Sequence, residues 1–212
     1  MRVRTDLPIP TMDFVQSKIS EFERDNDALE RGLTELIERF PKNEDVAHSL
    51  VKVAAINSLY NTQMRGIFRV AKVIADSGID SLLESGSDDA VKAIAKVEYT
   101  EKSRFNYSFA TKYCSWHRPE FYPIYDSRVD FCLRSYQAKD HFATLTEFDR
   151  FTQNDLWDYG KLRGIMKAFQ RHYRLESLIF KSLDKFLYQL GSAYFLVANR
   201  VLQPSGMAPR SA

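Results

Sequence analysis

Residues 107–129 contain the side chains whose types and spacing are best suited to chemistry. Pro119 and Pro123 end a preceding helix, because each fixes φ and disfavours helical geometry in the residue before it. Asp126 comes next and is the predicted N-cap of the helix that follows. Backbone N–H groups and the helix dipole hold a carboxylate at that position in its ionised form. If the helix end opens into a cleft, Asp126 can stabilise developing positive charge or orient a water; alternatively, Asp126 only caps the helix.

Apolar residues recur at helical spacing almost throughout the chain, and no strand pattern or internal repeat is visible. The sequence therefore predicts an all-α fold. We expect one globular domain over residues 1–202 and a flexible tail over residues 203–212. The expected helices lie near residues 14–22, 29–40, 46–56 (opened by Asn43), 67–74, 79–84, 90–97, 127–136, 146–151, 159–174 and 183–202.

Composition narrows the class of protein. The 212 residues are 44% hydrophobic and 13% aromatic, which is typical of a folded protein, and the net charge is only +2. Cys114 and Cys132 are too few for a four-cysteine cluster, and the four histidines lack metal-ligand spacing. We expect no metal, no cofactor, no signal peptide and no membrane segment, and hence a cytoplasmic protein.

Basic residues are concentrated in residues 161–174, which contain no acidic residue. Arg163, Lys167 and Arg171 recur at intervals of four and therefore share one helical face. Such a row predicts contact with a polyanion such as the DNA backbone; the alternative is a solvated face paired with acids elsewhere. Lys102 and Arg104 lie among aromatic residues, a pattern suited to phosphate contact with base stacking, although rings at helical spacing are more often core.

Two segments carry a resemblance to a known superfamily. Residues 50–74 form an apolar helix, a polar step at Asn57–Thr62 and a second helix, and residues 118–129 read RPEFYPIYDSRV. Both are similar to segments of helix-hairpin-helix DNA glycosylases of the endonuclease III and 8-oxoguanine glycosylase type. In that superfamily a proline and apolar residues precede the catalytic aspartate, and Thr or Ser follows it. The resemblance covers roughly residues 45–135.

The resemblance implies a two-lobed helical bundle with a cleft between lobes 43–125 and 1–42 plus 126–202. It implies a DNA glycosylase that flips out and hydrolytically excises a damaged or modified base, leaving an abasic site. Asp126 would be catalytic, with Lys112 as a nucleophile or phosphate ligand. The base pocket would contain Asn57, Tyr60, Asn61 and Trp116, and the DNA backbone would contact Lys102, Arg104, Arg163, Lys167 and Arg171. We expect a monomer, associated with the nucleoid if the cell is prokaryotic.

The chain departs from the superfamily at the hairpin. Residues 99–108 contain no glycine, although the superfamily's hairpin turn is glycine-rich and holds a DNA phosphate. Back-counting from Asp126 places the superfamily's Schiff-base lysine near residues 106–108, which contain no lysine. Lys112 lies about one and a half helical turns further along, so it either takes that place in a rearranged helix or is an ordinary solvated lysine. This departure argues against lyase activity and leaves Lys112 as the one candidate nucleophile.

Two other functions are compatible with the sequence. One is a non-catalytic nucleic-acid-binding protein on the same fold, and the other is a helical module that binds a protein partner. Salt-dependent binding to DNA separates the protein-binding module from the other two functions. Formation of abasic sites in modified DNA separates the enzyme from the non-catalytic binder.

Overall fold

The computed structural model of the chain describes residues 3–97, 106–143 and 151–201. Across these residues it has ten α-helices and one 3-10 turn and contains no strand, which confirms the all-α prediction. The helices are α1 (Met12–Asp25), α2 (Asp27–Arg39), α3 (Val46–Leu59), α4 (Ile67–Asp76), α5 (Ile79–Glu84), α6 (Asp88–Ala95), α7 (Tyr107–His117), α8 (Ser127–Asp140), η1 (Asn154–Trp157), α9 (Tyr159–Tyr173) and α10 (Phe180–Val201). The helix expected near residues 146–151 falls largely outside the described residues.

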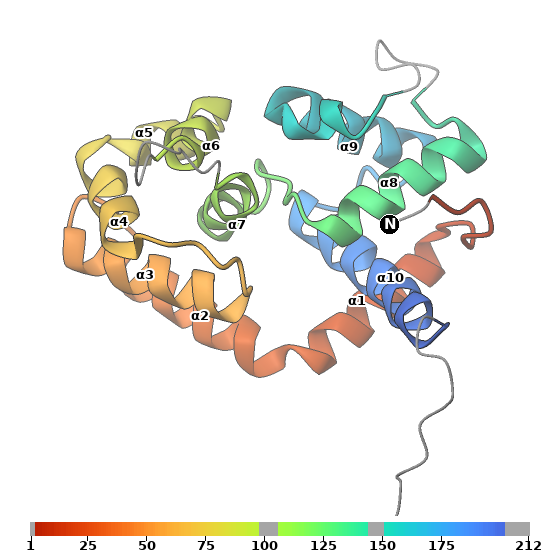
Figure 1. Ribbon diagram of the computed structural model, residues 1–212, viewed down its shortest axis with the longest axis horizontal. Coiled ribbons are helices and arrows are strands. Elements are labelled where there is room, and N and C mark those ends of the chain that lie inside the picture. Colours follow the sequence, from red (N-terminus) through yellow and green to blue (C-terminus); the bar gives the residue numbers. More distant parts are fainter. Residues whose placement is uncertain (1–2, 98–105, 144–150, 202–212) are drawn as a thin grey trace, which may run out of the picture.

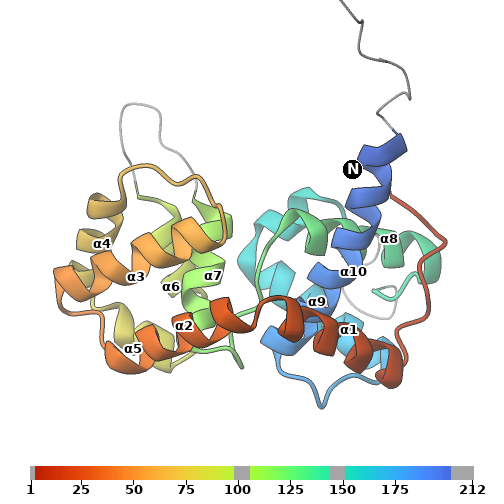
Figure 2. The same ribbon diagram turned by 90° about the horizontal axis from the view of Figure 1, so that it is seen from below.

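The helices form two lobes that lie side by side (Figures 1 and 2). The first lobe contains α2–α7, in which α3 packs against α4, and α6 against α7. The second lobe contains α1, α8, α9 and α10, with α10 packed against both α1 and α8. The sequence predicts that residues 1–42 join the second lobe. The structure instead packs α2 against α3 and α7, so the chain changes lobe at Asn26, between α1 and α2.

Side-chain caps define several helix starts. Asp126 begins α8 as predicted, because its Oδ1 accepts a hydrogen bond from the Arg128 backbone N–H at 2.8 Å. The start of α3 differs from the prediction, since Asp45 and not Asn43 accepts the capping bond. Asn43 is buried, and its Oδ1 accepts a hydrogen bond from Lys52 Nζ at 2.5 Å. A buried ammonium needs such acceptors, which explains why a polar residue lies inside the lobe here.

Aromatic residues of α7 form much of the core of the first lobe. Tyr107, Phe109 and Tyr113 are each at most 2% exposed, so these rings are core and are not available for stacking on bases. Two tyrosine hydroxyl groups form hydrogen bonds with backbone carbonyls near the lobe junction. Tyr107 donates to the Leu156 carbonyl at 3.0 Å, and Tyr159 donates to the Pro123 carbonyl at 3.2 Å.

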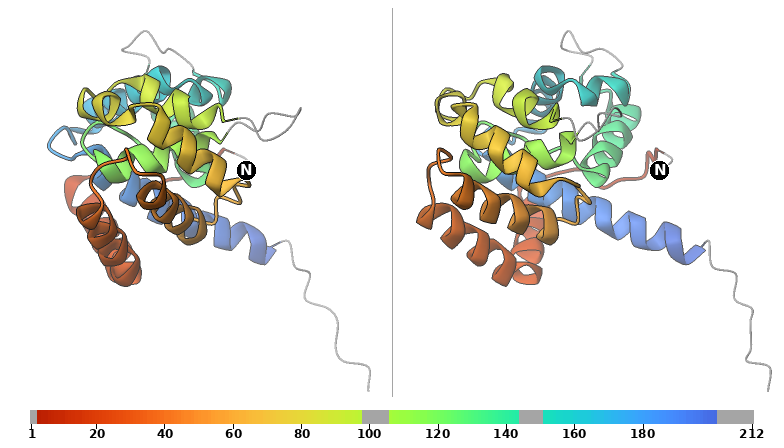
Figure 3. Two further views of the ribbon diagram at one scale, coloured as in Figure 1. Left: turned by 90° about the vertical axis from the view of Figure 1, so that its left-hand side faces the viewer. Right: turned by 60° about the vertical axis from the view of Figure 1, so that its left-hand side comes forward.

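The C-terminal helix α10 is the longest element and runs past the lobe junction, with its last turns extending beyond the other helices (Figure 3). Its first half carries Lys181, Asp184 and Lys185 toward the first lobe. Glu30 of α2 pairs with Lys181 at 3.3 Å and with Lys185 at 3.0 Å. These half-buried ion pairs fix α10 against α2. None of the helices in the described ranges is both long and apolar enough to cross a membrane.

Candidate active site

A pocket of about 660 Å³ lies where the two lobes meet. Both lobes and both connections between them contribute to its wall. Its lining includes the junction of α1 and α2, the end of α3, the start of α7, the segment leading into α8, and α10. The lining residues are Phe22, Asn26, Leu29, Leu59, Tyr60, Asn61, Thr62, Ser108, Lys112, Ile124, Tyr125, Asp126, Ser127, Arg128, Trp157, Asp184 and Tyr188.

Asp126 caps α8 and also faces this pocket. Its side chain is 16% exposed, so the carboxylate is largely desolvated but reachable from the pocket. Oδ1 receives the capping bond and lies 3.7 Å from the Arg128 guanidinium, while Oδ2 lies 3.6 Å from Lys112 Nζ. Two cationic groups and a backbone N–H therefore surround the Asp126 carboxyl group.

Lys112 is one of the most deeply buried charged residues among the described residues, with 3% exposure. Its Nζ donates to Ser108 Oγ at 2.6 Å and to the Tyr125 carbonyl at 3.4 Å, and it lies 5.6 Å from the Tyr60 ring centroid. Burial lowers the Lys112 pKa below its ordinary value, and the charge of Asp126 opposes that shift. Lys112 is therefore not the solvated surface lysine that the sequence left as an alternative.

The predicted base-contact residues divide into two groups. Tyr60 and Asn61 line the pocket, and Asn61 adopts a positive φ of 47° at the end of α3. Asn57 does not line it, because its side chain binds the loop that follows: Oδ1 accepts from Thr62 Oγ1 at 2.6 Å and from the Met64 N–H at 2.9 Å. Asn57 thus shapes the polar loop that forms one wall.

Trp116 also lies behind the pocket wall. It is 6% exposed, its indole N–H donates to the Tyr60 hydroxyl at 3.0 Å, and Lys181 Nζ lies 3.1 Å from its ring centroid. Trp116 is not among the pocket-lining residues. In this structure it positions Tyr60 and does not offer a free stacking face.

Asp184 of α10 is a second carboxyl group of the pocket that the sequence analysis missed. It is 8% exposed, and its Oδ1 atom is buried without a hydrogen-bond partner among the described residues. Desolvation, reinforced by the nearby charge of Asp126, raises the Asp184 pKa to about 8. One signal was available: its neighbours one turn away in either direction are Phe180 and Tyr188, so it is a lone acid on an aromatic stripe.

None of the three predicted DNA-backbone residues that the structure describes lines the pocket. Lys102 and Arg104 lie outside the described residues. Arg163 joins α9 to α6, because its guanidinium contacts Asp88 at 2.7 Å and the Gly86 carbonyl at 2.8 Å. Lys167 and Arg171 are exposed on α9, and no residue of α9 lines the pocket. The cationic side chains that do line the pocket are Lys112 on α7 and Arg128 on the first turn of α8.

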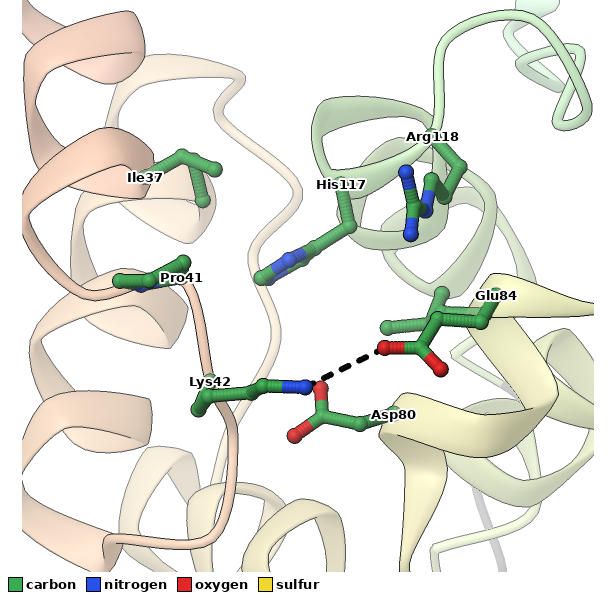
Figure 4. Close-up of a pocket in the computed structure, with 8 residues that line it drawn as sticks. Ile37, Pro41, Lys42, Asp80, Glu84, His117 and Arg118 are labelled. Atoms are coloured by element: carbon green, nitrogen blue, oxygen red, sulfur yellow. Dashed lines mark hydrogen bonds and ion pairs between the residues drawn. The ribbon is translucent and has the colours of Figure 1, made fainter.

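A second pocket of about 260 Å³ lies within the first lobe, and Figure 4 shows its labelled side chains. Lys42 and Glu84 pair there at 3.2 Å. His117 lines this pocket, and burial lowers its pKa to about 3, so the imidazole is neutral. With its lysine and glutamate already paired to each other, this pocket lacks the adjacent buried amine and carboxyls found between the lobes.

Comparison with known proteins gives the chain a family. Residues 14–121 match the HI_0787_N N-terminal domain family. The chain belongs to this family. A relative from Haemophilus influenzae, described as an uncharacterized protein, is 36% identical over 140 residues, which cover 66% of this chain and 64% of the relative. The alignment thus spans less than two thirds of the relative's length. No solved structure matches the chain.

The residues matched by the family model include only part of the pocket lining. Tyr60, Asn61 and Lys112 fall inside residues 14–121, whereas Asp126 and Asp184 lie beyond it. Any chemistry that needs both the amine and a carboxylate therefore depends on the chain that follows the family domain.

Proposed function

We propose that this protein is a DNA glycosylase-like enzyme that excises a damaged or modified nucleobase and leaves an abasic site. The observation that carries the proposal is the pair formed by Asp126 and Lys112, whose charged atoms lie 3.6 Å apart on the wall of the pocket between the lobes. A cap alone needs neither a buried amine beside it nor a pocket in front of it.

The arrangement suits cleavage of an N-glycosidic bond. As the bond between the base and C1′ breaks, its electrons leave with the base and positive charge develops on the deoxyribose. A fixed carboxylate beside the sugar stabilises that charge, and it needs no reorganisation because its helix end already holds it. Asp126 takes this role. A water molecule that adds to C1′ and loses its proton then gives the abasic site.

The pocket also suits an extruded nucleotide. Its volume of about 660 Å³ lies within the usual range for small-molecule sites, roughly 300–1,000 Å³. Tyr60 supplies a ring, and Asn61 and Thr62 supply amide and hydroxyl groups that can bind the edge of a base. These groups come from the first lobe, while Asp126 lies at the start of α8 in the second lobe. A flipped nucleotide would therefore be held between the lobes.

The α6–α7 pair supports the resemblance to helix-hairpin-helix glycosylases. The two helices pack against each other, and their consecutive ends meet because the Asn106 N–H donates to the Ala95 carbonyl at 2.9 Å. Asp126 then caps the next helix along the chain, which is the order that the resemblance implies. Most of the connection between α6 and α7 lies outside the described residues.

A second form of the chemistry, in which Lys112 attacks C1′ directly, is favoured by the burial of its amine. The lowered Lys112 pKa increases the fraction of neutral, nucleophilic amine, and Asp126 lies close enough to accept a proton. The covalent product would rearrange to an imine, which is the chemistry of a lyase. Base release is common to both routes, and only the attacking group differs.

The proposal is tested with duplex and single-stranded oligonucleotides that each carry one damaged or modified base. We expect the wild-type protein to release at least one of these bases, producing alkali-labile strands, and the Asp126→Asn protein to bind the same DNA without releasing the base. Salt-dependent binding with no base release would favour the non-catalytic DNA-binding function. Absence of any DNA binding would favour a protein-binding module.

A further inference from the structure

Asp184 is an acid for which the chemistry above has no role. It lines the same pocket as Asp126 and Lys112 and is more than nine-tenths buried, and its Oδ1 atom has no hydrogen-bond partner in the described parts of the chain. An unpartnered buried carboxylate is costly, whereas a protonated carboxyl group at the same place can donate a hydrogen bond to a bound molecule.

The two carboxyl groups of the pocket have opposite environments. Asp126 receives a backbone hydrogen bond and lies within 4 Å of both Lys112 Nζ and the Arg128 guanidinium. Among the residues that the structure describes, Asp184 has no such ion pair, and the nearby carboxylate of Asp126 disfavours a second negative charge. Environments that separate two titratable groups in this way commonly mark an acid and an anion with different tasks.

We propose that Asp184 is the general acid of this site, and that the substrate is therefore a nucleobase that leaves as a neutral molecule only after a ring nitrogen is protonated. This inference rests on the proposed function and specifies its substrate class. A base that already carries a positive charge, such as an N7-alkylated purine, leaves without such help. The built-in acid is suited to neutral modified purines.

The proton and electron balance of the step is complete. The Asp184 carboxyl proton passes to a ring nitrogen of the base while the bond between C1′ and the base breaks. The electron pair of that bond leaves with the base. Asp126 stabilises the sugar cation. The attacking water forms the new C1′–O bond, and its proton goes to the Asp184 carboxylate, which restores the acid for the next turnover.

The surroundings of Asp184 keep it protonated at neutral pH, since its pKa is raised to about 8. Charged and titratable groups reach it from every helix that borders this part of the pocket. They are Asp126 before α8, Lys112 on α7, Lys181 on α10, Glu30 on α2 and Tyr60 at the end of α3. The two lysines oppose the shift, and burial together with the two acids produces it.

The decisive experiment compares the pH dependence of single-turnover base release in wild-type and Asp184→Asn proteins. The probe is whichever neutral base in the oligonucleotide panel the wild-type protein releases fastest. We expect the wild-type rate to fall as the pH rises through about 8, as the acid loses its proton. The Asp184→Asn protein should be slower by about 100- to 10,000-fold near neutrality and should lack this fall.

Two further measurements keep the outcomes separate. First, the Asp184→Asn substitution should slow the release of N7-methylguanine from the same duplex much less than the release of the neutral base. Second, the wild-type protein should show the infrared band of a protonated carboxyl group at neutral pH, and the variant should lack that band. An Asp184→Asn protein with the wild-type rate and pH profile would overturn the inference and leave the proposed function standing, as would a wild-type protein that releases only the cationic base. A protein that releases no base at all would remove both.

Discussion

Lys112 Nζ lies 3.6 Å from Asp126 Oδ2, although α7 and α8 belong to different lobes. The chain between them folds back so that the Tyr125 carbonyl also meets the lysine, at 3.4 Å. The pair therefore joins α7 of the first lobe to the start of α8 in the second lobe. The pair thus makes the geometry of the lobe junction part of the proposed chemistry.

The first prediction separates the two roles of Asp126. Asn caps a helix about as well as Asp, so Asp126→Asn keeps the start of α8, whereas Asp126→Ala loses a cap worth about 1 kcal/mol. We expect both variants to lose base release by about 100-fold or more, because neither offers a negative charge to the sugar. Urea unfolding should show the Ala variant less stable than the Asn variant. An active Asp126→Asn protein would leave Asp126 as a cap only.

The second prediction concerns the attacking group. If Lys112 adds to C1′, borohydride reduces the imine and leaves a stable protein–DNA adduct on denaturing gels. On this route the wild-type protein forms the adduct and Lys112→Gln forms none. The Ser108→Ala protein is the matched control, because it removes the 2.6 Å partner of the amine and keeps the amine itself. Base release without an adduct would assign the attack to water.

The third prediction is a pH dependence of stability caused by Asp184. Its folded-state pKa of about 8 lies above the ordinary value of 3.8, so the folded protein binds this proton more tightly than the unfolded chain. Its stabilising contribution is complete below the unfolded pKa and is lost as the pH rises through the folded pKa.

This effect is measured against Asp184→Asn, since that comparison cancels the other titratable groups. The free energy of unfolding of the wild-type protein, relative to the variant, should fall with increasing pH by at most about 1.4 kcal/mol per pH unit. If the difference in unfolding free energy between the two proteins stays constant from pH 3.8 to about 8, Asp184 is not protonated in the folded protein.

The fourth prediction concerns the ion pairs between α2 and α10. Glu30→Gln leaves Lys181 and Lys185, which are 16% and 13% exposed, without their shared carboxylate. We expect a loss of about 1–3 kcal/mol in the free energy of unfolding. Glu23→Gln is the matched control, because Glu23 also pairs with Lys185 but is 54% exposed, and should cost less than about 1 kcal/mol. Equal losses would show that the junction does not depend on Glu30.

The fifth prediction tests the basic face of α9. Lys167→Ala and Arg171→Ala should each weaken DNA binding evenly across sequences and lower the salt-dependence slope by about 1. Arg163→Ala should instead reduce stability, since it removes the 2.7 Å contact with Asp88 that joins α9 to α6. Salt titrations that are unchanged in Lys167→Ala and Arg171→Ala would show that DNA does not contact this face.

Much of the fold was readable from local chemistry. Apolar spacing gave the helices, and Asp126 capped α8 where the prolines and the following residues indicated. The lobe to which α2 belongs was not readable, because its apolar face fits a helix surface in either lobe. The assignment of α2 to the first lobe comes only from packing: Leu33 of α2 is 1% exposed, and α2 contacts α3 and α7.

The candidate site was readable only in part. Asp126 was indicated by its cap position and Lys112 by resemblance, and the structure brings these two together. Asp184 lies 58 positions beyond Asp126 in the sequence, and no local pattern shows that α10 turns it toward that carboxylate. Trp116 and Asn57 were assigned to the base pocket through the resemblance, but hydrogen bonds hold them in its supporting wall.

The place where the family match stops has a practical consequence for work on relatives. A fragment ending at residue 121 would contain α1, whose packing partner α10 is then missing, and would expose the apolar side of Val15 and Ile19. Such a fragment would carry the amine with neither acid, so its inactivity would say nothing about the intact chain. Relatives are better compared as whole polypeptides, by asking whether they have acidic residues at the positions of Asp126 and Asp184.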